Sequence, residues 1–197
     1  MVKRIAVLLS GNGSNLQALI DHQDQMHGQI DLVISNKASA YGLVRAKEAG
    51  INTEVIIRDD AKILQLCKQK KIDIIVLAGY LAFVTPTLLQ AYENKIVNIH
   101  PSLIPSFCGP GAYGMHVHEK VIARGVKVTG ATVHFVSDEV DGGPIIMQKA
   151  CDISDLHVPE EVQQRVLVIE HEILVKSVAA LCQDQIEIEE GRVIIHE

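Results

Sequence analysis

The sequence lacks the features that mark membrane proteins and nucleic-acid-binding proteins. None of its apolar runs is long enough to span a bilayer. It has 18 Lys and Arg against 24 Asp and Glu, a formal net charge of -6, so the basic surface that nucleic acid requires is missing. It also lacks the G-x-x-x-x-G-K-[ST] loop of many ATP-binding proteins. We therefore expect no nucleic-acid or membrane partner.

Metal-ligand and redox patterns are also scarce. The four cysteines lie far apart with no C-x-x-C pair, so we expect inert thiols rather than a zinc or redox site. His116 and His118 form an H-x-H pair, but no third ligand accompanies them. The sequence therefore predicts no metal.

The N-terminus, MVKRIAVLLSGNG, begins with charged and then apolar residues and runs directly into a glycine turn. This pattern favours a first strand over a signal peptide, so we expect a cytoplasmic protein. At 197 residues, 48% of them hydrophobic, the chain is long enough for one domain with a proper core. We expect a single domain over residues 1–197.

Apolar runs alternate with stretches of helical spacing over the first half of the chain. The runs are RIAVLLS, IDLVISN, TEVII, DIIVLAG and KIVNIH, and the helical stretches are NLQALIDH, YGLVRAKEAG and AKILQLCKQKK. This alternation predicts an α/β fold with an open, mostly parallel, Rossmann-like sheet that helices cover on both faces.

The pattern changes in the C-terminal third. VTGATVHFVS and GPIIMQKACDI read as two strands joined by an acidic turn, which predicts an antiparallel extension of the sheet. Residues 158–182 begin with a proline and two glutamates and read as one long helix. A hairpin around Gly191 is expected to follow.

The stretch IVNIHPSLIP, residues 96–105, places two polar residues near the end of a strand. Asn98 and His100 are two positions apart, so their side chains point to the same face. Pro101 ends the strand at the edge where open parallel sheets place their ligands. Alone, the pair fits a ligand site and a purely structural pair equally well.

The turn SGNGSN, residues 10–15, lies between the first strand and the first helix. Free amides and a helix N-terminus favour an anion such as phosphate. The dinucleotide fingerprint is incomplete because Leu16 occupies the third glycine position, so a mononucleotide phosphate fits better than NAD. A tight turn that binds nothing is the alternative.

Two further segments contain candidate residues. PSLIPSFCGPGAYGMHVHEK, residues 101–120, contains three glycines and is expected to form a shaped loop rather than a helix. SDEVDGGPI, residues 137–145, fits a solvated turn or a cation site, although its spacing is not that of an EF-hand. Within it, the two glycines after Asp141 allow that carboxylate to turn inward.

In combination these segments resemble a known family. KRIAVLLSGNGSNLQALI, VISNKASAYGLVRAKEAGI, VLAGY, NIHPSLIPSF and GATVHFVSDEVDGGPIIMQ, in this order and spacing, resemble the phosphoribosylglycinamide formyltransferases of purine biosynthesis over nearly the whole chain. The resemblance implies transfer of a formyl group from 10-formyltetrahydrofolate, the cosubstrate, to the amine of glycinamide ribonucleotide. Both partners are small molecules, and nothing indicates an oligomeric state.

The resemblance also implies a set of site residues. The catalytic residues would be Asn98, His100 and Asp141. Substrate would be bound by Gly13, Ser14, Asn15 and Glu170, the last at the ribose. The folate would be bound by Asn98 together with Leu81, Ala82, Phe83 and Val84.

Three features depart from the pattern of that family. Leu81 and Ala82 stand where many relatives carry Met-Arg, so that arginine's side-chain contacts are lost while main-chain contacts to the pterin remain. The loop from Pro105 to His118 is several residues longer than usual, and Leu167 replaces a residue that is often polar.

The chemistry explains these residue types without the resemblance. When an amine attacks a formamide carbon, negative charge develops on the carbonyl oxygen, and fixed donors such as the Asn98 amide and a protonated His100 stabilise it. A neighbouring Asp141 would favour the imidazolium and guide a water that moves the amine proton. Methionyl-tRNA formyltransferases and deformylases share this core but carry a further domain. A mononucleotide-binding regulator is the alternative from another class.

Overall fold

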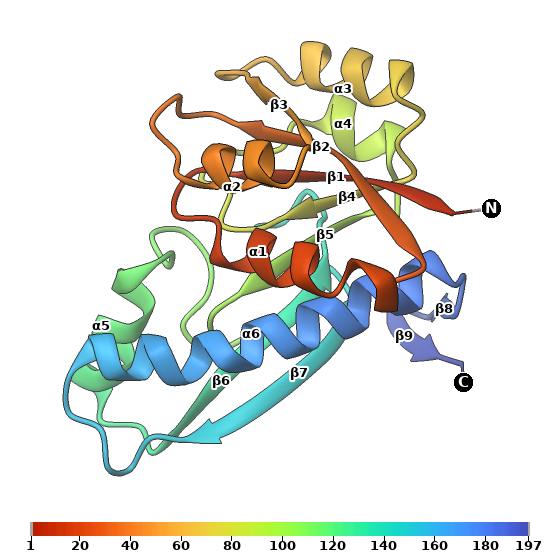
Figure 1. The fold of residues 1–197 in the computed structure, drawn as a ribbon. Helices are drawn as coiled ribbons and strands as arrows, with labels where there is room; N and C mark the ends of the chain where they lie inside the picture. The colour runs from red at the N-terminus through yellow and green to blue at the C-terminus, as the bar shows by residue number, and fades with distance from the viewer. Residues whose placement is uncertain (1, 197) are drawn as a thin grey trace.

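The computed structural model describes residues 2–196, which form nine strands, six α-helices and one short 3₁₀ helix (Figure 1). The strands are β1 (Lys3–Leu9), β2 (Gly28–Ser35), β3 (Asn52–Val55), β4 (Ile74–Leu77), β5 (Ile96–His100), β6 (Val128–Phe135), β7 (Ile145–Asp152), β8 (Ile186–Glu189) and β9 (Arg192–Ile195). The helices are α1 (Ser14–Asp21), η1 (Gln23–Gln25), α2 (Gly42–Glu48), α3 (Asp60–Gln69), α4 (Pro86–Ala91), α5 (Met115–Arg124) and α6 (Pro159–Cys182).

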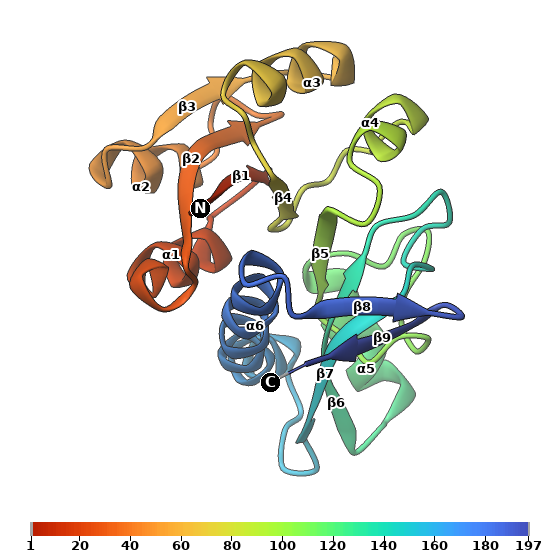
Figure 2. The same ribbon diagram turned by 90° about the vertical axis from the view of Figure 1, so that its right-hand side faces the viewer.

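Seven strands form one sheet in the order β3-β2-β1-β4-β5-β6-β7. β1 to β5 pair with one another in parallel, whereas β6 pairs antiparallel with β5 and β7 pairs antiparallel with β6. The predicted mostly parallel sheet and its antiparallel extension are therefore confirmed. The hairpin expected around Gly191 forms as a separate two-stranded sheet, β8-β9, next to β7 (Figure 2).

The sheet is covered on both faces because its central strands are apolar throughout. In β1, Ile5, Val7 and Leu9 contribute to one core cluster with α1, α2, α5 and α6, while Ala6 and Leu8 contribute to a second cluster with α3 and α4. Successive strand residues point to opposite faces, so a continuous apolar run supplies both clusters. These core clusters hold the sheet as a rigid platform for the loops at its carboxyl edge.

The strand order reverses direction beside β1. The chain runs from β1 outward through β2 and β3, then crosses to the other side of β1 to form β4. At such a switch point the loops after two adjacent strands diverge and leave a crevice for ligands. Here the Ser10 amide donates to the Gly79 carbonyl at 3.0 Å, and the Leu81 amide donates to Ser10 Oγ at 2.8 Å. The loops after β1 and β4 are thus joined.

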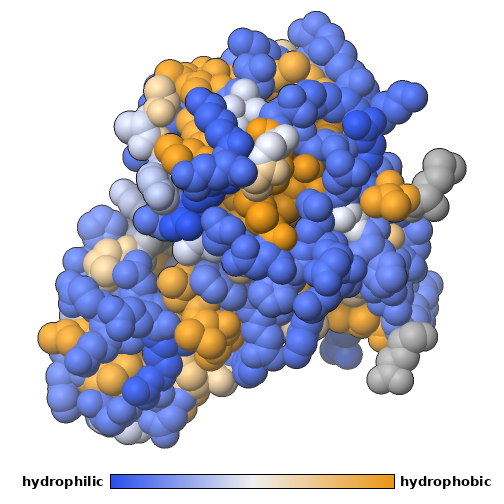
Figure 3. Space-filling view, viewed as in Figure 1, coloured by the Kyte–Doolittle hydropathy of each residue, from blue (hydrophilic) through white to orange (hydrophobic). Residues whose placement is uncertain are grey.

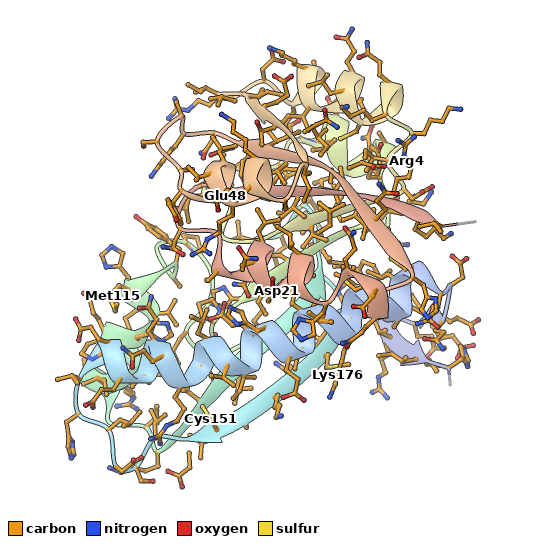
Figure 4. The ribbon with its side chains drawn as sticks, viewed as in Figure 1. Arg4, Asp21, Glu48, Met115, Cys151 and Lys176 are labelled. Atoms are coloured by element: carbon orange, nitrogen blue, oxygen red, sulfur yellow. The ribbon has the colours of Figure 1, made fainter. Side chains whose placement is uncertain are left out.

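The prediction of a loop over residues 101–120 is wrong from Met115 onward, where α5 begins (Figure 4). Val117 and Val121 are buried on one face of this helix, and Gly125 ends it in the left-handed conformation. The glycines before Met115 obscured the helical spacing after it. The sequence analysis also did not anticipate α4, a six-residue helix with Pro86 in its first turn.

Within residues 2–196, no helix is both long and apolar enough to cross a membrane. The face shown in Figure 3 is mainly hydrophilic, with smaller groups of apolar side chains between the charged ones. Exposed apolar side chains are normal on the surface of a folded domain.

Candidate active site

A cavity of about 420 Å³ opens at the carboxyl end of β5. Asn98 and His100 both line it, as expected for residues two apart on a strand. Asp141 lines it from the turn between β6 and β7, so the three predicted catalytic residues share one cavity. Its volume falls in the range of small-molecule sites.

His134 fixes the Asn98 amide from the neighbouring strand. The two residues are directly opposite in the β5-β6 ladder, and Asn98 Nδ2 lies 3.1 Å from His134 Nε2. The other ring nitrogen, Nδ1, lies 2.8 Å from the Phe135 carbonyl, an acceptor, so Nδ1 carries the proton and Nε2 accepts from Asn98. Burial lowers the pKa of His134 and favours this neutral form.

His100 is 4% exposed and has an acceptor near each ring nitrogen. Nε2 lies 3.1 Å from the Phe107 carbonyl, and Nδ1 lies 3.7 Å from Asp141 Oδ2. The Phe107 carbonyl is within hydrogen-bond distance of the ring, whereas Asp141 is close enough for a charge interaction only. The ring of His100 is therefore oriented by the loop on one side and faces the carboxylate on the other.

Asp141 is held between the two histidines by its backbone and by a loop amide. Its φ is +57°, and the Gly109 N–H donates to Oδ2 at 2.8 Å. The other carboxylate oxygen, Oδ1, lies 3.7 Å from His134 Nε2. Gly143 is required for this turn because a Cβ there would lie 1.9 Å from the Phe135 carbonyl oxygen.

The contacts of the segment Phe107–Gly109 with the site residues were not predicted from the sequence. The Phe107 carbonyl lies within hydrogen-bond distance of His100, and the Gly109 amide donates to Asp141. Both contacts are made by the main chain, so no side chain in the sequence signalled them. The extended loop after Pro101 therefore holds two of the three predicted catalytic side chains.

Thr132 secures the start of that loop. It lies opposite His100 in the β5-β6 ladder, and its hydroxyl donates to the Ser102 carbonyl at 2.6 Å. The same oxygen accepts from the Ile104 amide at 3.1 Å and from Gln148 Nε2 at 2.9 Å. All the hydrogen-bonding capacity of this buried hydroxyl is used, which restrains the chain immediately after His100.

The segment after β4 forms another wall of the cavity. The four predicted folate residues, Leu81, Ala82, Phe83 and Val84, all line it. Phe83 is 83% exposed and Leu81 is 50% exposed, so two large apolar side chains stand open at the rim. The protein itself leaves them uncovered, as expected where an apolar ligand is to bind.

The glycine turn lies outside the residues that line this cavity, although it joins the segment after β4 through Ser10. Ser14 is the first residue of α1, and Asn15 Nδ2 donates to Glu170 Oε2 on α6 at 2.8 Å. Burial raises the pKa of Glu170, while the hydrogen bond from Asn15 opposes that shift. Asn15 Oδ1 is buried without a hydrogen-bond partner in the described chain. Leu167 is half-buried on α6, three residues before Glu170.

The two histidines of the H-x-H pair have different surroundings. His116 is exposed and pairs with Glu119, with 3.0 Å between Nδ1 and Oε2. His118 is 1% exposed, and burial lowers its pKa to about 4. Residues two apart on a helix point to different sides. Among residues 2–196, no group of three or more His, Cys, Asp or Glu side chains could hold a metal ion.

The four cysteines are free thiols. Cys67 and Cys182 are buried, and burial raises the pKa of each to about 12. Such thiols are protonated at neutral pH and are poor nucleophiles.

Comparison with known proteins identifies close relatives. A family model described as formyl transferase matches residues 3–178. A phosphoribosylglycinamide formyltransferase from Haemophilus influenzae is 43% identical over 87% of this chain and 84% of its own length. The trifunctional purine biosynthetic protein adenosine-3 of Homo sapiens is 40% identical over 95% of this chain, which spans only 19% of that protein. These matches confirm the resemblance seen in the sequence motifs.

A solved structure agrees with them. Glycinamide ribonucleotide transformylase 1 from Symbiobacterium toebii superposes with a TM-score of 0.93 at 36% identity, and the match covers 100% of this chain and 95% of that one. The likeness thus extends over the parallel half, the antiparallel extension and the terminal hairpin.

Proposed function

Since the chain belongs to the formyl transferase family, we propose that it transfers the formyl group of 10-formyltetrahydrofolate to the amine of N1-(5-phospho-D-ribosyl)glycinamide, a step of de novo purine (IMP) biosynthesis. The observation that carries this proposal is the arrangement of Asn98, His100 and Asp141 in one cavity. A module that only bound a nucleotide would have no need for a carboxylate beside an oxyanion donor.

The folate binds in the cavity under the segment Leu81–Val84. Its aromatic rings need an apolar wall, which Leu81 and Phe83 offer, and polar partners from the main chain. Ala82 gives no charged contact, so recognition at that position depends on the backbone.

The phosphoribosyl part of the substrate binds between the glycine turn and α6. The amides of Gly13, Ser14 and Asn15 lie at the start of α1, where the helix dipole favours an anion. The free Oδ1 of Asn15 and the carboxylate of Glu170 are acceptors that suit ribose hydroxyls. Asn15 and Glu170 already contact each other, so this part of the site is preformed.

The reaction begins when the substrate amine attacks the formyl carbon. A new C–N bond forms and negative charge moves to the formyl oxygen, where an Asn98 N–H and a protonated His100 stabilise it. One N–H of Asn98 is bound to His134, which leaves the other for the substrate. Neutral His134 thus sets the direction in which the Asn98 amide donates.

Proton transfer completes the reaction. The attacking amine must lose a proton, and the folate nitrogen that carried the formyl group must gain one as its bond to carbon breaks. Asp141 lies close to His100 and accepts a loop amide, so it is placed to direct a water between the two nitrogens. The formyl group leaves on the substrate, and tetrahydrofolate is released.

A donor assay tests this function. Purified protein should formylate glycinamide ribonucleotide when 10-formyltetrahydrofolate is supplied and should do nothing with formate and ATP, because the chain lacks the G-x-x-x-x-G-K-[ST] loop. Chromatographic detection of the formylated product decides between the donors. Formylation from formate and ATP would refute the proposed donor. Binding of a phosphorylated ligand without turnover would instead favour a regulator.

Replacement of Gly13 by alanine tests the phosphate turn. Gly13 has a φ of +77°, and a Cβ there would lie 2.6 Å from the Gly42 Cα, so the turn must shift. We expect the KM for glycinamide ribonucleotide to rise about tenfold or more, because a small misplacement of binding groups is costly, while folate binding is retained.

Gly11→Ala is the matched control for that variant. Gly11 has no atom within 4 Å of an added Cβ, so this alanine has room. Thermal stability of both variants should be measured beside the steady-state constants. If Gly13→Ala weakened the binding of both substrates equally, general misfolding would explain the effect. The turn would then lose its assigned role.

The remaining features of the proposal concern the setting of the reaction. Residues 1–197 act as one formyltransferase domain in the cytoplasm and need neither a metal nor nucleic acid nor a membrane. Chelation should therefore leave turnover unchanged. Hydrogen bonds within the protein already hold the carboxylates of Glu170 and Asp141, so no metal is required to position them.

A further inference from the structure

Arg45, on α2, makes hydrogen bonds to the glycine turn. Its Nε donates to the Asn12 carbonyl at 3.0 Å, and its second guanidinium nitrogen, Nη2, donates to Asn12 Oδ1 at 3.0 Å. One side chain therefore holds both the main chain and the side chain of the residue that precedes Gly13. Figure 4 shows α2, which ends at Glu48, beside α1, which ends at Asp21.

The rest of the guanidinium is also fixed. Arg45 Nη1 donates to Gln17 Oε1 on α1 at 3.2 Å, and the group lies 4.9 Å above the centre of the Tyr41 ring. Such stacking and forked hydrogen bonding suit arginine and cannot be reproduced by lysine. Arg45 thus connects α2, the glycine turn and α1 in one defined geometry.

These contacts set the direction of the amides in the turn. The Gly11 carbonyl accepts from the Gly42 amide at 3.1 Å, and the Asn12 carbonyl accepts from Arg45. In a trans peptide the N–H points opposite to the carbonyl of the preceding residue. The amides of Asn12 and Gly13 therefore point away from α2. Neither donates a hydrogen bond to any group in residues 2–196.

Glycine on both sides of Asn12 makes this restraint necessary. A peptide unit next to glycine rotates with little steric hindrance, so the sequence alone does not fix where these amides point. An anion site made of successive amides works only if they converge. The contacts from α2 hold the peptide units of the turn so that their amides converge, which the glycines alone would not ensure.

We propose that Arg45 is a positioning residue for the phosphate of the substrate: by holding the Asn12 carbonyl and side chain, it keeps the amide of Gly13 directed at the phosphate. This inference rests on the proposed function of that turn. Arg45 acts through the turn rather than by contact with the reacting atoms, so it should affect substrate affinity and not the chemical step.

The test compares Arg45→Met with Lys47→Met. Lys47 is on the same helix, is exposed and makes no ion pair or side-chain hydrogen bond with other described residues, so its loss removes the same charge without touching the turn. The affinity for ribose 5-phosphate is measured by calorimetry, and KM and kcat are measured for both substrates. Thermal stability is recorded for each protein.

Arg45→Met should weaken the binding of ribose 5-phosphate and raise the KM for glycinamide ribonucleotide, each by about 10- to 100-fold. This is the effect expected for the loss of charge-assisted hydrogen bonds. The folate KM and kcat should stay within about threefold of the wild type, and Lys47→Met should change neither affinity by more than about twofold. Arg45→Lys, which keeps the charge but loses the fork, should recover only part of the affinity.

Amide hydrogen exchange over residues 11–15 gives a readout that needs no ligand. The segment should exchange faster in Arg45→Met than in Lys47→Met, because its peptide units are no longer held. Unchanged exchange together with unchanged phosphate affinity would overturn the inference. Full recovery by Arg45→Lys would also overturn it, because charge alone would then suffice.

Failure of the proposed function is distinguishable from failure of this inference. If the wild type bound ribose 5-phosphate but transferred no formyl group, the function would be wrong and the role of Arg45 could still be measured by calorimetry. If the wild type transferred the formyl group and Arg45→Met bound ribose 5-phosphate normally, only the inference about Arg45 would be wrong. A wild type that did not bind ribose 5-phosphate would refute the phosphate turn and Arg45 together.

Discussion

Asp141→Asn should lower turnover by about 10²- to 10⁴-fold while the protein stays folded and still binds both substrates. Asparagine keeps the shape of the side chain and tolerates the positive φ of this position, +57°, but it removes the charge that faces His100 and the base that directs the water. The amide oxygen can still accept from the Gly109 N–H, so the turn should be preserved.

Turnover, both substrate affinities and thermal stability should be measured for the wild type and the variant. Asp24→Asn is the control for loss of a carboxylate, because Asp24 is exposed and does not line the cavity. Near-normal turnover would remove Asp141 from the mechanism.

Asn98→Ala should cost about 10²- to 10³-fold in kcat, the usual loss for one oxyanion donor, with only small changes in KM. The reason is that the amide acts most strongly on the charge that develops after binding. Asn98 lies within the sheet, so replacement by the smaller alanine leaves the β5-β6 ladder in place. It also leaves His134 Nε2 without its partner, so some loss of stability is expected.

Single-turnover kinetics separates these effects, because it isolates the chemical step from product release. Asn52→Ala, at the far edge of the sheet in β3, controls for the removal of an amide side chain elsewhere. A large rise in KM with kcat retained would show that Asn98 binds the folate rather than stabilising the oxyanion.

The sequence was sufficient to predict a mostly parallel sheet because several segments carry the same hydrophobic pattern. The parallel strands other than β3 are short runs rich in apolar residues, which predict a sheet covered on both faces. The strand order was not predicted. The helices that were missed carry weak signals: α4 has six residues, and the spacing of α5 starts directly after Gly114. The local sequence pattern does not predict a helix that is short or that begins inside a glycine-rich segment.

Residue spacing alone predicted the site only where two functional side chains come from one strand, whereas Asp141 and Leu81–Val84 were assigned from the family resemblance. The alternation of β5 places Asn98 and His100 on the same face. The role of His134 depends on the register of β5 against β6, which no local pattern reveals. Arg45 was missed for a similar reason, because its partners lie in a different element.

The extended loop has a consequence for how this sequence can vary. Phe107 and Gly109 reach His100 and Asp141 by main-chain atoms alone, and the thiol of Cys108 between them turns back to the Pro105 carbonyl at 3.2 Å. Neither contact therefore depends on the side chain at position 107 or 108, although Phe107 also packs against the core. A deletion of a single residue would move one contact out of reach, so the two contacts depend on the length of the loop.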